Sequence, residues 1–129
     1  MARIFFLAFN SADPTPLIKK LRNLGHRLIV AEPRYPEFDQ ILRQQAQPPD
    51  VVVCDASKFP SQARETCNYL RGLKATRAVP FILYNVKPED EEKTRARVAG
   101  AVLLRDDDIL PAIDAALAAR PGTSNFPNA

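Results

Sequence analysis

The sequence predicts an α/β fold in which one parallel five-stranded sheet is covered by helices on both faces. Five short apolar runs alternate with helical patterns along the 129 residues, and the connections between them are short. The runs are continuously apolar rather than alternating, which is typical of strands buried on both faces. A chain of this length forms one domain, so we expect a (βα)5 three-layer sandwich over residues 1–119 and a loose tail over 120–129.

The chain opens with a strand and a helix. Residues 4–9 are continuously apolar and predict the first strand. An aspartate often caps a helix, and Asp13 precedes a helical pattern, so we expect the first helix to begin there. Leu24 falls on the apolar face of this pattern, and Gly25 is expected to end the helix.

The middle of the chain supplies three further strands and two helices. Residues 28–31, 51–54 and 79–84 are short apolar runs that predict strands. Residues 35–46 and 61–73 carry apolar side chains at helical spacing and predict helices between those strands. Because a helix joins each strand to the next through short connections, the strands are expected to be parallel.

The fourth predicted helix, residues 88–99, is very polar. Its acidic residues come first and its basic residues follow, which suits the helix dipole. Only Ala96, Val98 and Ala99 are expected to pack against the core. This helix should therefore be the least firmly anchored of the five.

The last βα unit completes the sheet. Residues 101–104 predict the fifth strand, and Asp107 or Asp108 is expected to cap the final helix. Right-handed crossovers between parallel strands leave few topologies, of which the flavodoxin-like strand order 2-1-3-4-5 is the leading one.

Composition limits the classes of function. The net charge of +3 comes from 18 Lys and Arg against 15 Asp and Glu, and no basic run indicates nucleic-acid binding. Cys54, Cys67 and the single His26 are too few for a four-ligand zinc site of soft donors. No run reaches the ~20 apolar residues that cross a bilayer. We therefore expect a cytoplasmic protein with reduced cysteines, no cofactor, and neither nucleic acid nor membrane as a partner.

No catalytic motif is evident, so we expect no enzyme. His26 lies in a predicted turn without an acidic partner, where solvation is the expected state, and Ser11 and Ser57 lack the Gly-x-Ser-x-Gly elbow. With four glycines the chain has no phosphate-binding loop. Tyr35 and Phe59 offer a docking surface, although single exposed aromatic residues are common.

Asp55 is the most informative residue. It ends the run Pro-Asp-Val-Val-Val-Cys-Asp, and the carboxyl ends of parallel strands are where such folds place their chemistry. With its neighbours, this run resembles the receiver domain of two-component response regulators over residues 2–119. The further matches are Leu24-Gly25, Leu70-Arg71, Pro80 and Ala99-Gly100-Ala101. In that family the aspartate accepts a phosphoryl group from a histidine kinase, so the resemblance places Asp55 at the phosphoacceptor position.

With the pair of acidic residues counted as one position, four of the five positions that define the family's site are substituted. Ala8 and Phe9, or Phe9 and Asn10, replace the two acidic metal ligands. Asn85 replaces the hydroxyl residue, and Arg105 or Asp106 replaces the lysine. Leu103 or Leu104 replaces the aromatic switch residue. Mg²⁺ prefers oxygen ligands, and phosphoryl transfer depends on its charge. We therefore expect no metal at Asp55, which should instead accept hydrogen bonds from the loop at Ser57 or Lys58.

These observations favour a degenerate receiver, or pseudo-receiver, that acts by protein–protein contact. One alternative is a genuine phosphoacceptor with atypical metal ligation, for which Asp13 and Asp106, Asp107 and Asp108 lie in loops at the same sheet edge. Another is a small flavodoxin-like enzyme or ligand-binding protein.

The resemblance also indicates an interaction face. Receivers contact partners or form dimers through the fourth helix, fifth strand and fifth helix, and here that helix carries Glu91, Glu92, Arg95 and Arg97 in blocks of opposite charge. Such blocks suit a two-fold contact between copies or a signalling partner. The first helix, with Lys19, Lys20 and Arg22, is the alternative face.

Overall fold

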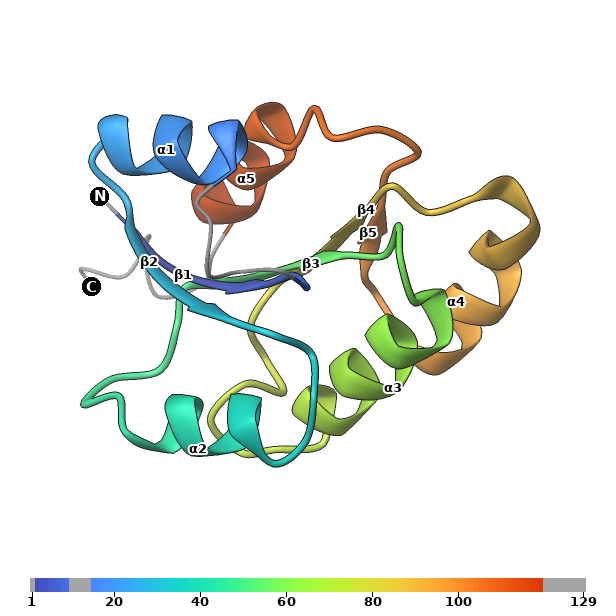
Figure 1. The fold of residues 1–129 in the computed structure, drawn as a ribbon, viewed down its shortest axis with the longest axis horizontal. Helices are drawn as coiled ribbons and strands as arrows, with labels where there is room; N and C mark the ends of the chain where they lie inside the picture. Colours follow the sequence, from blue (N-terminus) through green and yellow to red (C-terminus); the bar gives the residue numbers. More distant parts are fainter. Residues whose placement is uncertain (1, 10–14, 120–129) are drawn as a thin grey trace.

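The computed structural model describes residues 2–9 and 15–119, and the predicted tail lies outside them. The sheet has the order β2-β1-β3-β4-β5, and all four strand pairs are parallel, which confirms the predicted flavodoxin-like topology (Figure 1). The elements are β1 Arg3–Leu7, α1 Pro16–Asn23, β2 Arg27–Ala31, α2 Glu37–Arg43, β3 Val51–Asp55, α3 Pro60–Arg71, β4 Phe81–Tyr84, the 3₁₀ turn η1 Pro88–Asp90, α4 Glu91–Arg97, β5 Val102–Leu103 and α5 Leu110–Ala118.

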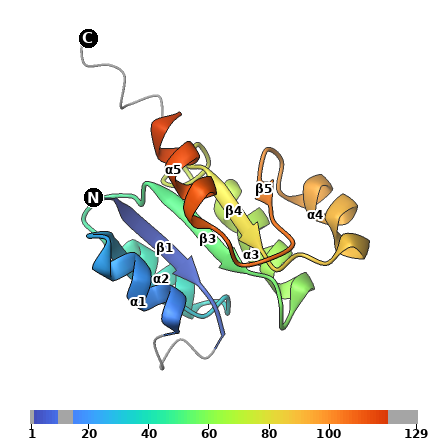
Figure 2. The same cartoon turned by 90° about the horizontal axis from the view of Figure 1, so that it is seen from above.

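The sheet separates two apolar cores. Helices α1 and α5 cover one face, and α2, α3 and α4 cover the other, as Figures 1 and 2 show. Successive side chains of β1 alternate between them: Ile4 and Phe6 pack under α1 and α5, whereas Phe5 and Leu7 pack under the other three helices. Because both faces are covered, the strand interiors are apolar, as the sequence predicts, and the charged residues of the described strands lie at strand ends: Arg3, Arg27 and Asp55. No helix in the described ranges is both long and apolar enough to traverse a bilayer.

Three strands are shorter than their apolar runs, whereas β2 and β3 each extend one residue beyond theirs, to Arg27 and Asp55. β1 ends at Leu7, two residues before the predicted end, and β5 contains only Val102 and Leu103. β4 begins at Phe81 because Pro80 has no N–H to donate, although its carbonyl still accepts from the Val52 amide at 2.9 Å.

The predicted boundaries of α1 were partly wrong. Thr15 caps the helix: its hydroxyl oxygen accepts a hydrogen bond from the Ile18 amide at 3.2 Å, while Asp13 lies outside the described residues. Leu24 was predicted to face the core but is 57% exposed, because it is the C-cap residue and lies beyond the last helical turn. Gly25 follows with φ of 92°, which agrees with its predicted role in ending the helix.

Two predictions about the last third of the chain were also wrong. In α4, the buried residue is Thr94, and Val98, the C-cap residue, is also buried. Ala96 and Ala99 are exposed, because the helix is only seven residues long and its buried side carries Thr94. No aspartate side chain caps α5, whose N-cap is Ile109. The aspartates form a turn instead: Oδ1 of Asp106 accepts from the amide of Asp108 at 3.0 Å.

Arg71, at the end of α3, joins three separate parts of the chain. Its guanidinium donates to the carbonyl oxygens of Arg77 and Val79, at 3.0 and 2.9 Å, and to that of Ala99 at 2.8 Å. It also lies over the ring of Phe81, 4.3 Å from the centroid. Desolvation lowers the pKa of this arginine, and the carbonyl contacts compensate its partial burial.

Candidate functional site

The residues predicted for the site come together at the carboxyl edge of the sheet. Asp55 is the last residue of β3 and pairs in register with Tyr84, so Asn85 follows immediately on the neighbouring strand. On the other side of β3, Leu7 pairs with Cys54, which places Ala8 next to Asp55. The structure thus brings together the positions that the resemblance implies for the phosphoacceptor, the hydroxyl residue and one metal ligand.

The carboxylate of Asp55 is half-buried and makes internal hydrogen bonds. Its Oδ1 accepts from the amide of Ser57 at 2.9 Å, as we expected from the sequence, and from Nδ2 of Asn85 at 3.4 Å. The bond to Ser57 closes a turn of the type that aspartate forms with the backbone two residues on. No hydrogen bond reaches Oδ2 from the described residues.

Asn85 has an unusual backbone. Its φ of 57° lies in the left-handed region, which asparagine tolerates better than most residues. Its own amide donates to the carbonyl of Asp106 at 3.2 Å, and the amide of Val86 donates to Leu104 at 2.9 Å. Asn85 therefore ties the β4–α4 loop to the end of β5 and directs its side chain to Asp55.

The end of β1 presents apolar groups to this edge. Ala8 is buried, and its amide donates to the carbonyl of Ala31 at 3.0 Å. The ring of Phe9 packs edge-on against Phe59, with the centroids 4.8 Å apart, and the guanidinium of Arg34 lies 5.7 Å from the Phe9 centroid. Neither residue carries an oxygen ligand. Asn10, the other predicted position, lies outside the described residues.

The contact between Phe9 and Phe59 was missed by sequence reasoning, which treated Phe59 as an isolated exposed aromatic residue. The available signal was position: each phenylalanine closely follows the end of one of two adjacent strands. Tyr35 likewise is not isolated, since its ring contacts Phe38 and Tyr69 at centroid distances of 6.0 and 5.5 Å.

Arg105, one of the two residues that the resemblance places at the family's lysine position, is paired with Glu91. Its Nε donates to Oε2 of Glu91 on α4 at 2.6 Å, so the residue at the family's lysine position is paired with a helix rather than with the phosphoacceptor position. The hydrogen bond lowers the pKa of Glu91 below its usual value, and the carboxylate raises the pKa of Arg105.

The residues present do not fit a divalent cation. Over residues 2–9 and 15–119, no three side chains of His, Cys, Asp or Glu gather where an ion could bind. Asp106 is engaged with Asp108 in the turn before α5, and Asp13 is not among the described residues. Phe9 supplies no donor where the family has a carboxylate.

Two titratable groups near this edge are structural. Burial raises the pKa of the Tyr84 phenol, and the negative charge of Asp55 adds to the effect, so Tyr84 stays neutral against Phe6. Hydrogen bonding to Cys67 and burial likewise raise the pKa of the Cys54 thiol. At the opposite edge, His26 accepts a hydrogen bond from the amide of Ala2 at 3.2 Å, which gives it a structural role where we expected a solvated residue.

The predicted interaction face is partly engaged within the chain. Glu91 pairs with Arg105, and Arg97 pairs with Glu65 on α3. Glu92 and Arg95 are exposed, and within the described ranges neither forms an ion pair. Some of the charged residues of α4 therefore form ion pairs within the chain, and others remain exposed on its surface.

No family model and no curated protein matches the sequence. Among solved structures, CheY4, a chemotaxis response regulator of Vibrio cholerae, superposes with a TM-score of 0.70 at 16% identity, covering 91% of this chain and 99% of that one. The chain has the fold of a response-regulator receiver domain. NtrX of Brucella abortus, solved in complex with ADP, gives a TM-score of 0.72 at 13% identity over 98% of this chain.

The fraction of each structural neighbour's chain that this chain covers differs widely. It spans 28% of the NtrX chain. A protein from Rhodopirellula baltica described as an adenylate cyclase has a TM-score of 0.73 at 14% identity, covering 98% of this chain and 94% of that one. At such identities the likeness concerns the fold, and function has to be argued from the residues.

Proposed function

We propose that this chain is a receiver-like signalling domain that has lost magnesium-dependent aspartyl phosphorylation and acts by protein–protein contact in the cytoplasm, without enzymatic activity. One observation carries the proposal: Phe9, which directly follows Ala8 at the end of β1, packs against Phe59 beside the phosphoacceptor position. A hydrated divalent cation needs oxygen ligands there, and two aromatic rings exclude them.

The surroundings of Asp55 support the same proposal. Oδ1 is held by Ser57 and Asn85, and Arg105, at the position of the family's lysine, is paired with Glu91. Without a cation or a lysine beside it, the charge on a transferring phosphoryl group would not be neutralised. The polar residues at this edge therefore stabilise loops.

We place the contact on the surface of α4, β5 and α5. Glu92 and Arg95 are exposed there, and Val102 on the edge strand is 41% exposed. A two-fold arrangement would set Arg95 of one copy near Glu92 of the other, because such interfaces are self-complementary. A signalling partner with matching charges would use the same residues.

The chemistry is tested with beryllofluoride and Mg²⁺, which mimic a phosphorylated aspartate. We expect no localised shifts in the amide spectrum around Asp55, Asn85 and Leu103. A second candidate, a phosphoacceptor with atypical ligation, is favoured only by the absence of a hydrogen bond to Oδ2 of Asp55 from the described residues. Shifts at these residues that disappear in Asp55→Ala would establish that candidate instead.

The contact is tested by sedimentation of matched charge reversals. Arg95→Glu should weaken self-association or partner binding, whereas Lys19→Glu on α1 should leave either unchanged. The opposite pattern would move the contact to α1. The variant Asp55→Ala should bind as the unmodified chain does, because Asp55 lies outside the proposed contact surface of α4, β5 and α5.

A further inference from the structure

The structure gathers cations at the edge of the sheet opposite to Asp55. Arg3 and Arg27 are the first residues of β1 and β2 and pair in register. Arg43 is the last residue of α2, and Lys74 lies in the connection from α3 to β4. Because helices run antiparallel to the strands in this fold, their C-terminal ends meet the first residues of the strands. Residues distant in the sequence thus form one basic edge.

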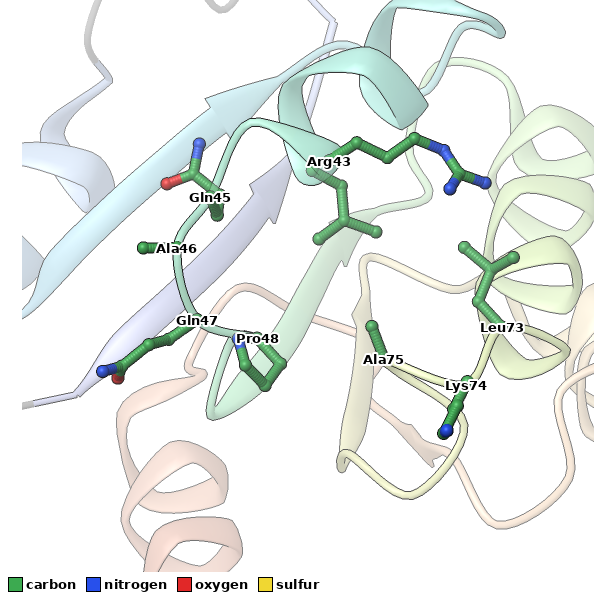
Figure 3. A pocket seen from close by; sticks show the side chains of 9 residues that line it. Arg43, Gln45, Ala46, Gln47, Pro48, Leu73, Lys74 and Ala75 are labelled. Carbon is green, nitrogen blue, oxygen red and sulfur yellow. The ribbon is translucent and has the colours of Figure 1, made fainter.

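Two clefts lie on either side of the segment 45–47 at this basic edge. The larger has a volume of about 450 Å³, which is within the range of about 300–1,000 Å³ of binding pockets. Its apolar lining includes Leu42, Pro48 and Leu73, and its cations are Arg43 and Lys74. Figure 3 shows the side chain of Arg43 extending from α2 towards the side formed by Leu73.

The second cleft, of about 210 Å³, shares residues 45–47 with the first and is otherwise lined by Arg3 and Arg27. Among the described residues, no acidic side chain lines either cleft. Each cleft therefore presents two cations without an acid in its own lining. An anionic group would be favoured on both sides of the segment 45–47.

Two of these four cations, Arg27 and Lys74, carry charge that is available to a ligand. Arg27 and Lys74 are exposed and form no ion pair within the described ranges. Arg43 forms an ion pair with Asp39, in which Nε donates to Oδ2 at 2.8 Å, so much of its charge is already balanced. Arg3 is paired more loosely, since its Nη2 lies 3.9 Å from Oδ1 of Asp50.

The carbonyl groups at the helix ends do not need these cations as hydrogen-bond donors. The carbonyl of Ile41 accepts from the Gln44 amide at 3.2 Å and from Nε2 of Gln45 at 3.0 Å. The carbonyl of Leu70 accepts from the Leu73 amide at 3.1 Å. Backbone and amide groups therefore satisfy these terminal carbonyls, and the Lys74 ammonium is not needed as their cap.

We propose that the basic edge binds an acidic peptide segment of a protein partner. An aliphatic side chain of the peptide enters the larger cleft between Leu42 and Leu73, and carboxylates on either side of it meet Lys74 and Arg27. The exposed carboxamide of Gln47 lies between the clefts, where it can pair with a peptide backbone.

A single-stranded nucleic acid fits this edge less well. Bases bind such surfaces by stacking on aromatic side chains, and the residues described for the two clefts include none. Leucine and proline instead suit an aliphatic anchor. The site lies at the opposite edge from Asp55 and away from the exposed residues of α4, so its failure and that of the function proposed above are separable.

The test uses a fluorescein-labelled ten-residue peptide of glutamates with two central leucines, measured by anisotropy with the whole chain. We expect saturable binding, with amide shifts concentrated in residues 42–48 and 73–75. Lys74→Glu and Arg27→Glu should each weaken binding by about fivefold to tenfold, since reversal replaces an attraction by a repulsion. Lys58→Glu, an equal charge change at the other edge, is the matched control and should stay within about twofold.

Two further probes decide the chemistry. An all-glutamate peptide of the same length should bind about fivefold to tenfold more weakly, because it lacks the aliphatic anchor. Absence of shifts at millimolar peptide, or an equal loss in Lys58→Glu, would overturn the proposal. A ten-nucleotide oligothymidine that binds the same residues more tightly than the peptide would also overturn it, in favour of nucleic acid. Lys74→Gln, which removes the charge without reversing it, should give an intermediate loss.

Discussion

The side-chain amide of Asn85 donates to Oδ1 of Asp55 at 3.4 Å from a backbone whose φ is 57°. Asparagine accepts this left-handed conformation, but a β-branched residue does not. The replacement of the family's hydroxyl residue is thus coupled to the path of the β4–α4 loop as well as to the chemistry of Asp55.

Restoring a hydroxyl at this position should therefore destabilise the fold. We expect Asn85→Thr to lower the free energy of unfolding by about 1–3 kcal/mol, the usual cost of a strained backbone. Asn85→Gly removes the same amide without strain and should cost less than the threonine. Urea titration measures the free energy of unfolding of both variants. Equal decreases in the two variants would show that the hydrogen bond from the Asn85 side chain, and not backbone strain, determines the effect.

Rebuilding the missing acids should create a cation site. The unmodified chain is expected to show no localised Mn²⁺ broadening in its amide spectrum, because Ala8 and Phe9 supply no ligand. The double variant Ala8→Asp, Phe9→Asp places two carboxylates beside Asp55 and should show broadening centred there. Adding Asp55→Ala to the double variant is the control, and strong broadening that survives it would place the ion elsewhere.

Removing the guanidinium of Arg71 should be costly. Arg71→Met keeps part of the apolar contact with Phe81 but leaves the carbonyls of Val79 and Ala99 without their donor. We expect a loss of about 2–4 kcal/mol in the free energy of unfolding, since hydrogen bonds from a charged donor contribute more than neutral ones. Arg77→Met, at an exposed position in the same loop, should change it by less than about 0.5 kcal/mol. Similar losses in the two variants would contradict this account.

The pair of Glu91 and Arg105 should make a pH-dependent contribution. Its hydrogen bond lowers the pKa of Glu91 in the folded chain, so stability is gained above the unfolded pKa and is lost as the pH falls through the folded pKa. The difference in stability between the unmodified chain and Arg105→Ala should therefore be present at pH 7, begin to fall near the ordinary glutamate pKa of about 4.3 and disappear in stronger acid, below the lowered pKa of Glu91. Thermal melts at both pH values measure it, and high salt should reduce it. A difference that is the same at both pH values would exclude the carboxylate as its source.

The sequence predicted the sheet well because burial on both faces leaves an unbroken apolar run, as in Val51–Cys54. It predicted caps poorly. Asp13 and Thr15 are both good N-cap residues two positions apart, so residue type alone does not distinguish them, and in the structure the N-cap is Thr15. The same limit applies to α5, where the amide of Asp108 donates to Asp106, the amide of Ile109 donates to the carbonyl of Asp107, and Ile109 is the N-cap.

At the site, sequence reasoning found the positions and one partner of Asp55, the loop at Ser57, but not the other partners. The alignment of Asp55 with Asn85 follows from counting along parallel strands, so the hydrogen bond between them was within reach. The pairing of Arg105 with Glu91 and of Phe9 with Phe59 depends on side-chain directions in loops, which periodicity does not describe. The basic edge was hidden for another reason: its cations are spread over 72 positions from 3 to 74, and only the parallel topology collects them.

The brevity of β5 has a consequence for motion. Only two residue pairs of β5 are in register with β4, and a few backbone hydrogen bonds around Leu104 extend the contact, so the amides of this edge should exchange with solvent before those of β1 and β3. A segment that opens at so little cost can be ordered by a bound protein alone. In such a domain, docking at α4, β5 and α5 would take the place of the phosphoryl group as the event that selects one conformation of the edge.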